Sequence, residues 1–555
     1  MNLDDQGVSP RYTTGEAPAG NGAAAGPAHE WTAANTPPAG YPSAYGSADD
    51  PSVDDPSVGP APTGQAPGRP RWWVLAPAVM CFAVAACLAM RLPVFFGGDE
   101  RSHFTYTVSV INGELPSLDE PQLLDDRFPI VEASYTNAAG RVAQPRPVGV
   151  ANHPPAAYVI AAPLVRLAAE GPDSWPPVAM RLMNAAAMST GIVLTGCFAA
   201  AAFPRTRLIG LGSATLAAVT PSVAIVAAWG QNDGLAFASA AGALYLTVKL
   251  LQRRPSIALL GASSLVAALA FLTRASLAPL VALLVGAAAL SEWRHRTTTR
   301  AGLVRAVGAG GFVGVVGLAG GGWFLLRNNH LYGSPTADTY LLERYSRVPH
   351  GSLVDVLTSG EFPWLMFRGL YAAPHHLQLY DEARWVVVAL VVLCVAGSVA
   401  WLVRRSAERR AGGPRANAPG DRGPLRLTGW LLIAVACAGT YVGTASFYAE
   451  GGAPHPRYFF ALVPVTSALL ARAACELPAA RAWLVATVGL LGAVSVSQIT
   501  QLPDLIWITR APPAWTTAPG PASARTAMLA IAVAAAAVTL AGLVIAHRKD
   551  ASDAR

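Results

Sequence analysis

Long apolar stretches alternate with short polar segments along the chain from residue 72 onward. A helix of about 20 apolar residues crosses the hydrocarbon core of a bilayer. The pattern predicts twelve membrane-spanning helices, near 72–90, 178–203, 208–228, 234–251, 256–272, 275–291, 303–326, 384–403, 427–447, 458–475, 482–499 and 525–546. The expected fold is therefore an all-α polytopic membrane protein.

One further apolar stretch, 153–170, departs from this pattern. It is short and contains three prolines together with Arg166 and Glu170, which favours an interfacial or re-entrant helix over a span. If it were a true span, the orientation of all later helices would be inverted. With the stretch interfacial and the N-terminus inside, every clearly basic short loop, such as 404–426, faces the cytoplasm, as the positive-inside rule requires. We therefore predict a plasma-membrane protein with both termini cytoplasmic and a large first outer loop, about 91–177.

The composition of the chain indicates its segments and which kinds of partner it binds. Residues 1–68 are rich in Pro, Ala, Gly and Ser and predict a disordered cytoplasmic tail. This tail is followed by a transmembrane core over 69–475, C-terminal transmembrane helices over 476–546 and a short cytoplasmic tail over 547–555. Only 13% of the 555 residues are charged, about half of what a soluble domain carries. The chain has a net charge of +7, and an excess of basic residues in a membrane protein usually lies in its cytoplasmic loops. No basic patch occurs among exposed aromatic residues, so we expect no nucleic-acid partner.

Cysteines and histidines give no sign of a metal centre. All six cysteines fall in apolar stretches, which argues against a disulfide framework or a thiolate site. The adjacent pair His375-His376 has no carboxylate at a recognisable spacing. Phosphate-binding loops, Ser-His-Asp elbows and His-Glu-x-x-His are also absent from the sequence. We therefore predict no cofactor; a divalent metal is compatible with the chain but nothing indicates one.

The strongest candidate for chemistry is Asp99-Glu100 with His103, just past the first apolar stretch. Charged groups beside the hydrocarbon layer need water, partners or a function. A carboxylate with fixed geometry at this boundary can act as a general base on a hydroxyl group. The plainer interpretation is that the two acids only solvate the start of a loop.

Further polar residues fall on the predicted outer side, where they would meet the same membrane face. As candidates for binding substrate we take His153, Asn232, Asp233, Arg274, His455 and Arg457. Arginine binds phosphate oxygens bidentately, and Arg274 and Arg457 are exceptions to the positive-inside trend. Each has a plainer interpretation: a helix start for His153, helix capping for Asn232 and Asp233, snorkelling for Arg274, and a surface ion pair of Arg457 with Glu450.

Taken in order, Asp99-Glu100-x-x-His103, His153-Pro154-Pro155, Asn232-Asp233 and Arg457-Tyr458 resemble the GT-C glycosyltransferase superfamily over roughly residues 70–475. The closest resemblance is to enzymes of the protein mannosyltransferase type and to a bacterial membrane-protein family of unknown function that shares the Asp-Glu-x-x-His. The composition resembles that of a high-GC actinobacterial protein.

The resemblance implies a GT-C-like fold and an inverting sugar transfer at the outer membrane face. The donor would be a polyprenyl-phosphate-linked sugar, and the acceptor a hydroxyl of a glycan, lipid or protein. Asp99 would deprotonate the acceptor, with Glu100 and His103 positioning it. His153, Arg274 and Arg457 match the groups that hold the lipid phosphate, although many relatives have Lys where His153 stands.

Two other classes of function remain open at this point. A lipid or polysaccharide transporter or flippase would carry charged residues along a path inside its spans, and here the spans are almost free of acids. A cell-envelope assembly protein would tolerate replacement of Asp99.

Overall fold

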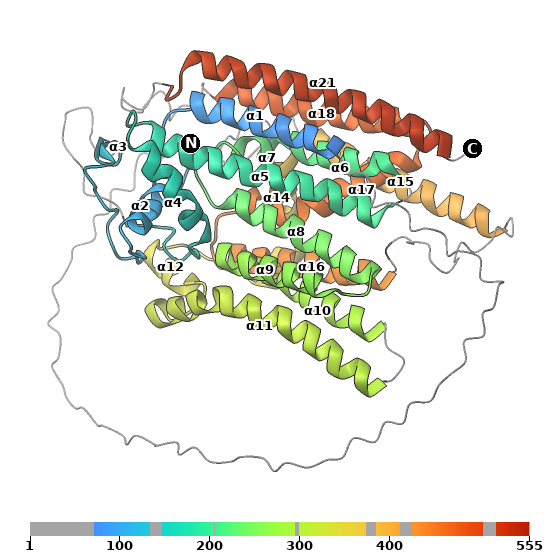
Figure 1. Cartoon of the computed structure of the whole chain (residues 1–555), viewed down its shortest axis with the longest axis horizontal. Helices are drawn as coiled ribbons and strands as arrows, with labels where there is room; N and C mark the ends of the chain where they lie inside the picture. Colours follow the sequence, from blue (N-terminus) through green and yellow to red (C-terminus); the bar gives the residue numbers. More distant parts are fainter. Residues whose placement is uncertain are drawn as a thin grey trace, which may run out of the picture. The chain divides into compact units, whose positions relative to one another are not determined.

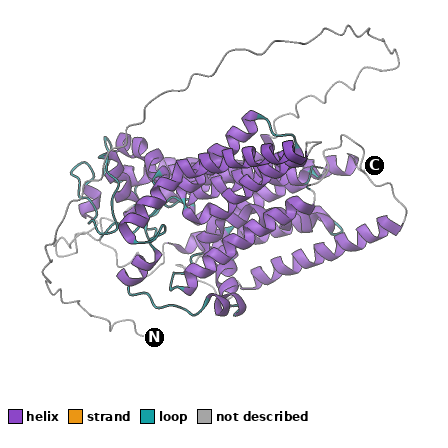
Figure 2. Cartoon of the chain, turned by 90° about the horizontal axis from the view of Figure 1, so that it is seen from below, coloured by secondary structure: helices purple, strands orange, loops and turns teal. Residues whose placement is uncertain are grey.

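A computed structural model of the protein describes residues 72–133, 147–204, 206–294, 299–372, 384–410, 425, 427–502 and 518–553. The predicted disordered tail, 1–68, and the His375-His376 pair lie outside these residues. In the described residues the regular secondary structure is helical (Figure 2), and one isolated bridge joins Pro121 to Pro147. Residues Arg69–Arg555 form one compact unit.

Figure 1 shows the helices in their order along the chain. Their bounds are η1 Trp72–Val74, α1 Leu75–Arg91, α2 Glu100–Ile111, α3 Pro129–Ala133, α4 Ala156–Ala168, α5 Trp175–Ala202, α6 Arg207–Val219, α7 Pro221–Val226, α8 Asp233–Gln252, α9 Ile257–Thr273, η2 Ala275–Leu277, α10 Ala278–Arg294, α11 Thr299–Tyr332, α12 Asp338–Arg344, α13 Leu353–Thr358, α14 Glu361–Tyr371, α15 Arg384–Arg410, α16 Leu427–Ala449, η4 Pro456–Leu462, α17 Val463–Glu476, α18 Ala480–Gln501 and α21 Ala522–Asp553.

The prediction of a polytopic helical membrane protein is confirmed in its general form. Nine helical segments in the described part of the chain are long and apolar enough to cross a membrane, and all nine coincide with predicted spans. The other three predicted spans, 72–90, 208–228 and 256–272, fall on shorter apolar helices. The stretch 153–170 forms α4, whose 13 residues extend about 20 Å, too short to cross alone.

The predicted span 208–228 is interrupted rather than continuous. Thr220 leaves the helical conformation with ψ 120°, and Pro221 then starts α7. Proline has no amide hydrogen to donate and disfavours a helical residue before it. α7 ends at Val226, and the connection that follows carries Gln231 and Asn232 and leads to Asp233, the first residue of α8.

The connections predicted to be cytoplasmic gather at one end of the bundle. Arg404 and Arg472, from α15 and α17, both pair with Glu476. Asp550 near the C-terminus accepts hydrogen bonds from the backbone of Arg207 and Leu208 at 3.1 and 3.0 Å. These contacts join segments far apart in the sequence, as expected if the helices run back and forth across one layer.

At the other end lies a layer that comprises α2, α3, α4 and α12 (Figure 1). It has its own apolar core, in which the Tyr106 and Tyr158 rings stack with centroids 3.9 Å apart. The end of α11 joins it: Tyr332 accepts a hydrogen bond from the backbone of Leu118 at 2.9 Å, and Asn328 donates to the carbonyl of Asn152 at 2.9 Å. The first predicted outer loop thus packs on the end of α11.

Candidate functional site

Four charged side chains from four separate segments form a continuous line of ion pairs beneath this layer. Arg457 donates to Asp99 at 2.5 Å and lies 3.8 Å from Asp233 on its other side. Asp233 in turn pairs with Arg274 at 2.8 Å. We call Asp99, Arg457, Asp233 and Arg274 the charge chain. Its signs alternate, so each buried charge has an opposite neighbour.

Helix ends place these residues. Asp99 stands immediately before α2, and Asp233 is the first residue of α8, where the helix dipole favours a negative charge. Arg274 ends α9, and Arg457 lies on the short helix η4. The site is therefore built from four connections that meet at one end of the bundle.

Burial distinguishes Asp99 from the rest of the charge chain. The Asp99 side chain is 46% exposed, against 8% for Arg457, 9% for Arg274 and 0% for Asp233. Asp99 is thus the member of the chain that a solvent-borne or membrane-surface molecule reaches first.

Amide groups from the turn before α8 hold the two arginines. Gln231 accepts from Arg457 at 2.7 Å, and Asn232 accepts from Arg274 at 3.0 Å. The Asn232 amide nitrogen donates to the carbonyl of Thr273 at 3.3 Å and to Nδ1 of His153 at 3.2 Å. Asn232 stands at the N-cap position of α8 but its side chain makes no capping bond, so capping does not explain it.

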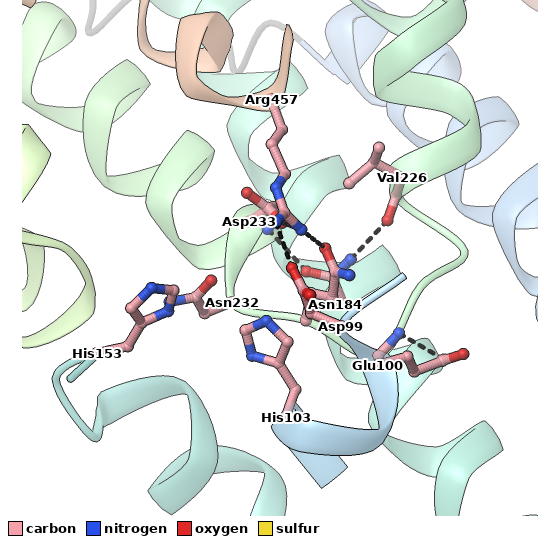
Figure 3. Close-up of polar contacts among 12 residues, drawn as sticks. Asp99, Glu100, His103, His153, Asn184, Val226, Asn232, Asp233 and Arg457 are labelled. Atoms are coloured by element: carbon pink, nitrogen blue, oxygen red, sulfur yellow. Dashed lines mark hydrogen bonds and ion pairs between the residues drawn. The ribbon is translucent and has the colours of Figure 1, made fainter. Parts of the chain in front are cut away.

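Two histidines lie beside Asp99, as Figure 3 shows. The rings of His103 and His153 have centroids 5.8 Å apart. Nδ1 of His103 shares a hydrogen bond of 2.9 Å with the Tyr158 hydroxyl, and its buried Nε2 has no hydrogen-bond partner in the described part of the structure. Because the amide nitrogen of Asn232 can only donate, Nδ1 of His153 must accept, which leaves the proton of the neutral ring on Nε2.

The electrostatic surroundings set the charge of each of these groups. Burial, reinforced by Arg274 and Arg457, lowers the pKa of His153 to about 3. Burial and the neighbouring His153 also hold the pKa of His103 well below its usual value. Both rings are therefore neutral at pH 7. Although burial acts in the opposite direction, the Arg457 guanidinium holds the pKa of Asp99 below its usual range.

Glu100 lies in a different environment from its neighbour Asp99. Its buried carboxylate accepts two hydrogen bonds from Arg181 of α5, at 2.6 and 2.8 Å. It also accepts from the backbone of Gly230 at 2.8 Å and of Gly97 at 3.2 Å. In Figure 3 it extends away from His153 and the charge chain. The hydrogen-bond acceptors of the Glu100 carboxylate are thus used by other groups of the protein.

Arg181 completes this arrangement with its remaining donors. It donates to the carbonyls of Ala89 and Leu92, both at 2.9 Å, and of Pro93 at 2.6 Å. The pair of Glu100 with Arg181, which we call the Glu100–Arg181 lock, fastens the end of α1, the start of α2 and the turn before α8 to one point on α5.

The structure brings together most of the residues proposed from the sequence. Asp99, Asp233, Arg274 and Arg457 share the charge chain, and His103, His153 and Asn232 adjoin it. His455 lies at the edge, its ring 5.8 Å from that of Tyr458.

Sequence reasoning missed Arg181, Gln231 as a ligand of Arg457, and Tyr158. A charged residue inside the predicted span 178–203 was the available signal for Arg181, since such residues are rare in membrane helices. Tyr158 gave no comparable signal, because its role depends on a contact with His103 across 55 residues.

The arrangement offers a proton acceptor and an anion-binding pair rather than a metal centre. No group of three or more His, Cys, Asp or Glu suited to a metal occurs among the residues that the structure describes. Asp99 can accept a proton from a nearby hydroxyl, and the two arginines can hold an anion.

No protein-family model matches the sequence, and no curated protein matches it.

Proposed function

We propose that the protein is a membrane glycosyltransferase that moves a sugar from a polyprenyl-phosphate donor to an acceptor hydroxyl at the outer membrane face. The observation that carries the proposal is the half-exposed Asp99 carboxylate, which pairs with buried Arg457 and is linked through Asp233 to buried Arg274. The carboxylate provides a base for the acceptor, and the arginines provide cations for a phosphate leaving group, within one site.

The chemistry would proceed by direct displacement with inversion. The acceptor oxygen attacks the anomeric carbon and its proton passes to Asp99. The bond between the anomeric carbon and the phosphate oxygen breaks, and its electron pair leaves with the lipid phosphate. Arg457 and Arg274 stabilise the charge on that phosphate, so no strong general acid is needed.

The ion pair between Asp99 and Arg457 has a consequence for this mechanism. A carboxylate with a lowered pKa is a weak base, and in the free protein Arg457 keeps Asp99 in that condition. A phosphate that takes over the Arg457 contact would remove part of this stabilisation and raise the basicity of Asp99. Donor binding would then activate the base.

His153 plays a smaller part in this proposal than a lysine would. Its ring is neutral at pH 7, so it offers the phosphate a hydrogen bond from Nε2 rather than a positive charge.

The test compares Asp99→Asn with the wild type. Asparagine keeps the shape and cannot take up a proton. Turnover is measured with radiolabelled polyprenyl-phosphate sugars in membranes, together with donor binding and folding. Asp119→Asn is the matched control, because Asp119 also pairs with an arginine in the outer layer but is not part of the charge chain.

We expect Asp99→Asn to lose at least 100-fold in turnover, within the range for a general base, while it retains folding and donor binding. Asp119→Asn should turn over normally. Equal turnover in wild type and Asp99→Asn would overturn the assignment of the base. Absence of turnover in the wild type across the donors would favour transport or assembly.

A further inference from the structure

A row of aromatic rings and guanidinium groups in contact with one another begins at the charge chain. The Tyr458 ring lies 5.8 Å from the guanidinium carbon of Arg457 and 5.9 Å from that of Arg274. Phe447, near the end of α16, packs edge-on against Tyr458 with centroids 5.5 Å apart. The guanidinium of Arg347 follows, 5.8 Å from the Phe447 ring.

Arg347 lies close to two rings. Its guanidinium carbon is 5.4 Å from the Tyr345 centroid, in addition to the Phe447 contact. Tyr345 is 46% exposed. We call Tyr345, Arg347 and Phe447 the aromatic–arginine platform.

Among the described residues, the Arg347 side chain contacts aromatic rings only, and its guanidinium N–H groups donate no hydrogen bond. Arg344 in α12, three residues earlier, provides a contrast, because it pairs with Asp119 and donates to the Tyr340 hydroxyl at 2.6 Å. Rings cover the faces of a guanidinium and leave its N–H donors in the plane directed outward. The N–H donors of Arg347 are therefore available to a ligand.

The loop that carries Arg347 is fixed at both ends. Ser346 takes the left-handed conformation that ends α12, with φ 46°, and the Arg347 amide donates to the carbonyl of Leu342 at 2.9 Å. Further on, the His350 amide donates to the carbonyl of Ala449 at 2.9 Å, and its ring stacks on Tyr448 with centroids 4.3 Å apart.

Gly451, in the loop after α16, brings that loop into direct contact with the loop that carries Arg347. It has φ +90°, and a Cβ atom there would lie 2.7 Å from the carbonyl oxygen of Val348. Only glycine suits both the conformation and the approach. The platform is thus mounted on a rigid backbone, which lowers the entropic cost of binding a ligand.

We propose that the aromatic–arginine platform binds an anionic saccharide. The apolar face of a sugar ring would lie against Tyr345 or Phe447, and a carboxylate or phosphate on the sugar would accept bidentate hydrogen bonds from Arg347. A neutral sugar would leave Arg347 without its counter-charge and bind more weakly.

This inference rests on the proposed function for its further step, the identification of the saccharide as the acceptor. Tyr458 and Phe447 connect the platform to Arg457, which contacts Asp99. A chain lying along these rings would present a hydroxyl toward Asp99 while its anionic group is held at Arg347.

The experiment measures saturable binding of fluorescent tetrasaccharides to the full chain in lipid nanodiscs. The probes are a tetramer of glucuronate and, as its neutral counterpart, a tetramer of glucose. The variants are Arg347→Gln and Arg347→Lys, with Arg344→Gln as the matched control because that arginine already has partners in the protein. Asp99→Asn is included so that binding is tested apart from turnover.

We expect the wild type to prefer the acidic tetramer, and Arg347→Gln to weaken that binding about tenfold, as loss of one charged hydrogen-bonding group predicts. Arg347→Lys should fall in between, because lysine keeps the charge without the planar fork. Arg344→Gln should bind like the wild type.

Three results would overturn the proposal: no saturable binding by the wild type, equal affinity for the two tetramers, or unchanged binding by Arg347→Gln. Undecaprenyl phosphate is added as a competitor. If it displaces the acidic tetramer and its own affinity falls in Arg347→Gln, Arg347 binds the lipid phosphate and the saccharide assignment is wrong. Failure of Asp99→Asn to reduce turnover would remove the catalytic proposal but leave the binding result standing.

Discussion

The Glu100–Arg181 lock gives a prediction that separates a structural role of Glu100 from a catalytic one. Glu100→Gln keeps the size of the side chain but removes its charge, and its amide nitrogen would face donors where the carboxylate oxygens accepted four hydrogen bonds. Arg181 would remain buried without a counter-charge. Breaking a buried pair by removing one partner costs about 3–5 kcal/mol.

That cost should appear as a lower unfolding temperature of the purified protein. For a chain of 555 residues it corresponds to a decrease of about 3–4 °C, because a given free energy shifts the midpoint less in larger proteins. The assay is thermal unfolding in detergent, followed by intrinsic tryptophan fluorescence. Asp99→Asn is the control: the Asp99 side chain is half exposed and buried Arg457 keeps Asp233 as a second acidic neighbour, so we expect a change of no more than about 1 kcal/mol.

A double variant makes the test more specific. Arg181→Met alone leaves the Glu100 carboxylate buried beside two backbone donors, and should also destabilise. Glu100→Gln combined with Arg181→Met removes both charges and should be less destabilised than the sum of the single variants. Additive effects, or a Glu100→Gln protein that unfolds like the wild type yet has lost turnover, would refute the structural role.

Two further predictions concern the charge chain and helix packing. Replacing Arg457 with Gln removes the cation that lowers the pKa of Asp99. Because turnover needs the ionised carboxylate, the acid limb of the pH–rate profile should move to higher pH. Acid limbs that coincide in the wild type and the variant would contradict this. Gly234→Ala should cost about 1–3 kcal/mol by overpacking α5 against α8, since a Cβ atom would lie 2.3 Å from a backbone oxygen. Gly261→Ala, in open space within α9, should not lower the unfolding temperature in the same fluorescence assay, because alanine is the better helix former.

The sequence predicted the helical fold well because spanning segments have a strong signal of length and hydropathy. Its limit appears at short or broken helices. The span expected over 208–228 divides at Pro221, and a proline within an apolar stretch is compatible with either a kink or a break. Which one occurs depends on what the rest of the bundle packs against it.

The candidate site was predictable in its members more than in their contacts. Placing polar residues on one predicted side of the membrane grouped Asp99, Asp233, Arg274 and Arg457 correctly at one end of the bundle. Composition and spacing do not tell which acid pairs with which base. Adjacent residues at the start of a helix point in different directions, and for that reason Asp99 joins the charge chain while Glu100 turns toward Arg181.

The alternation of signs along the charge chain also bears on how a charged molecule reaches the site. Two aspartates and two arginines in close contact have no net charge, so their fields cancel beyond a few ångströms and steer little from a distance. Ionic strength should therefore have little influence on the rate of encounter and act instead on the strength of the contacts made after arrival. Lateral diffusion within the bilayer, rather than electrostatic attraction, would then set how quickly a lipid-borne anion finds this end of the helix bundle.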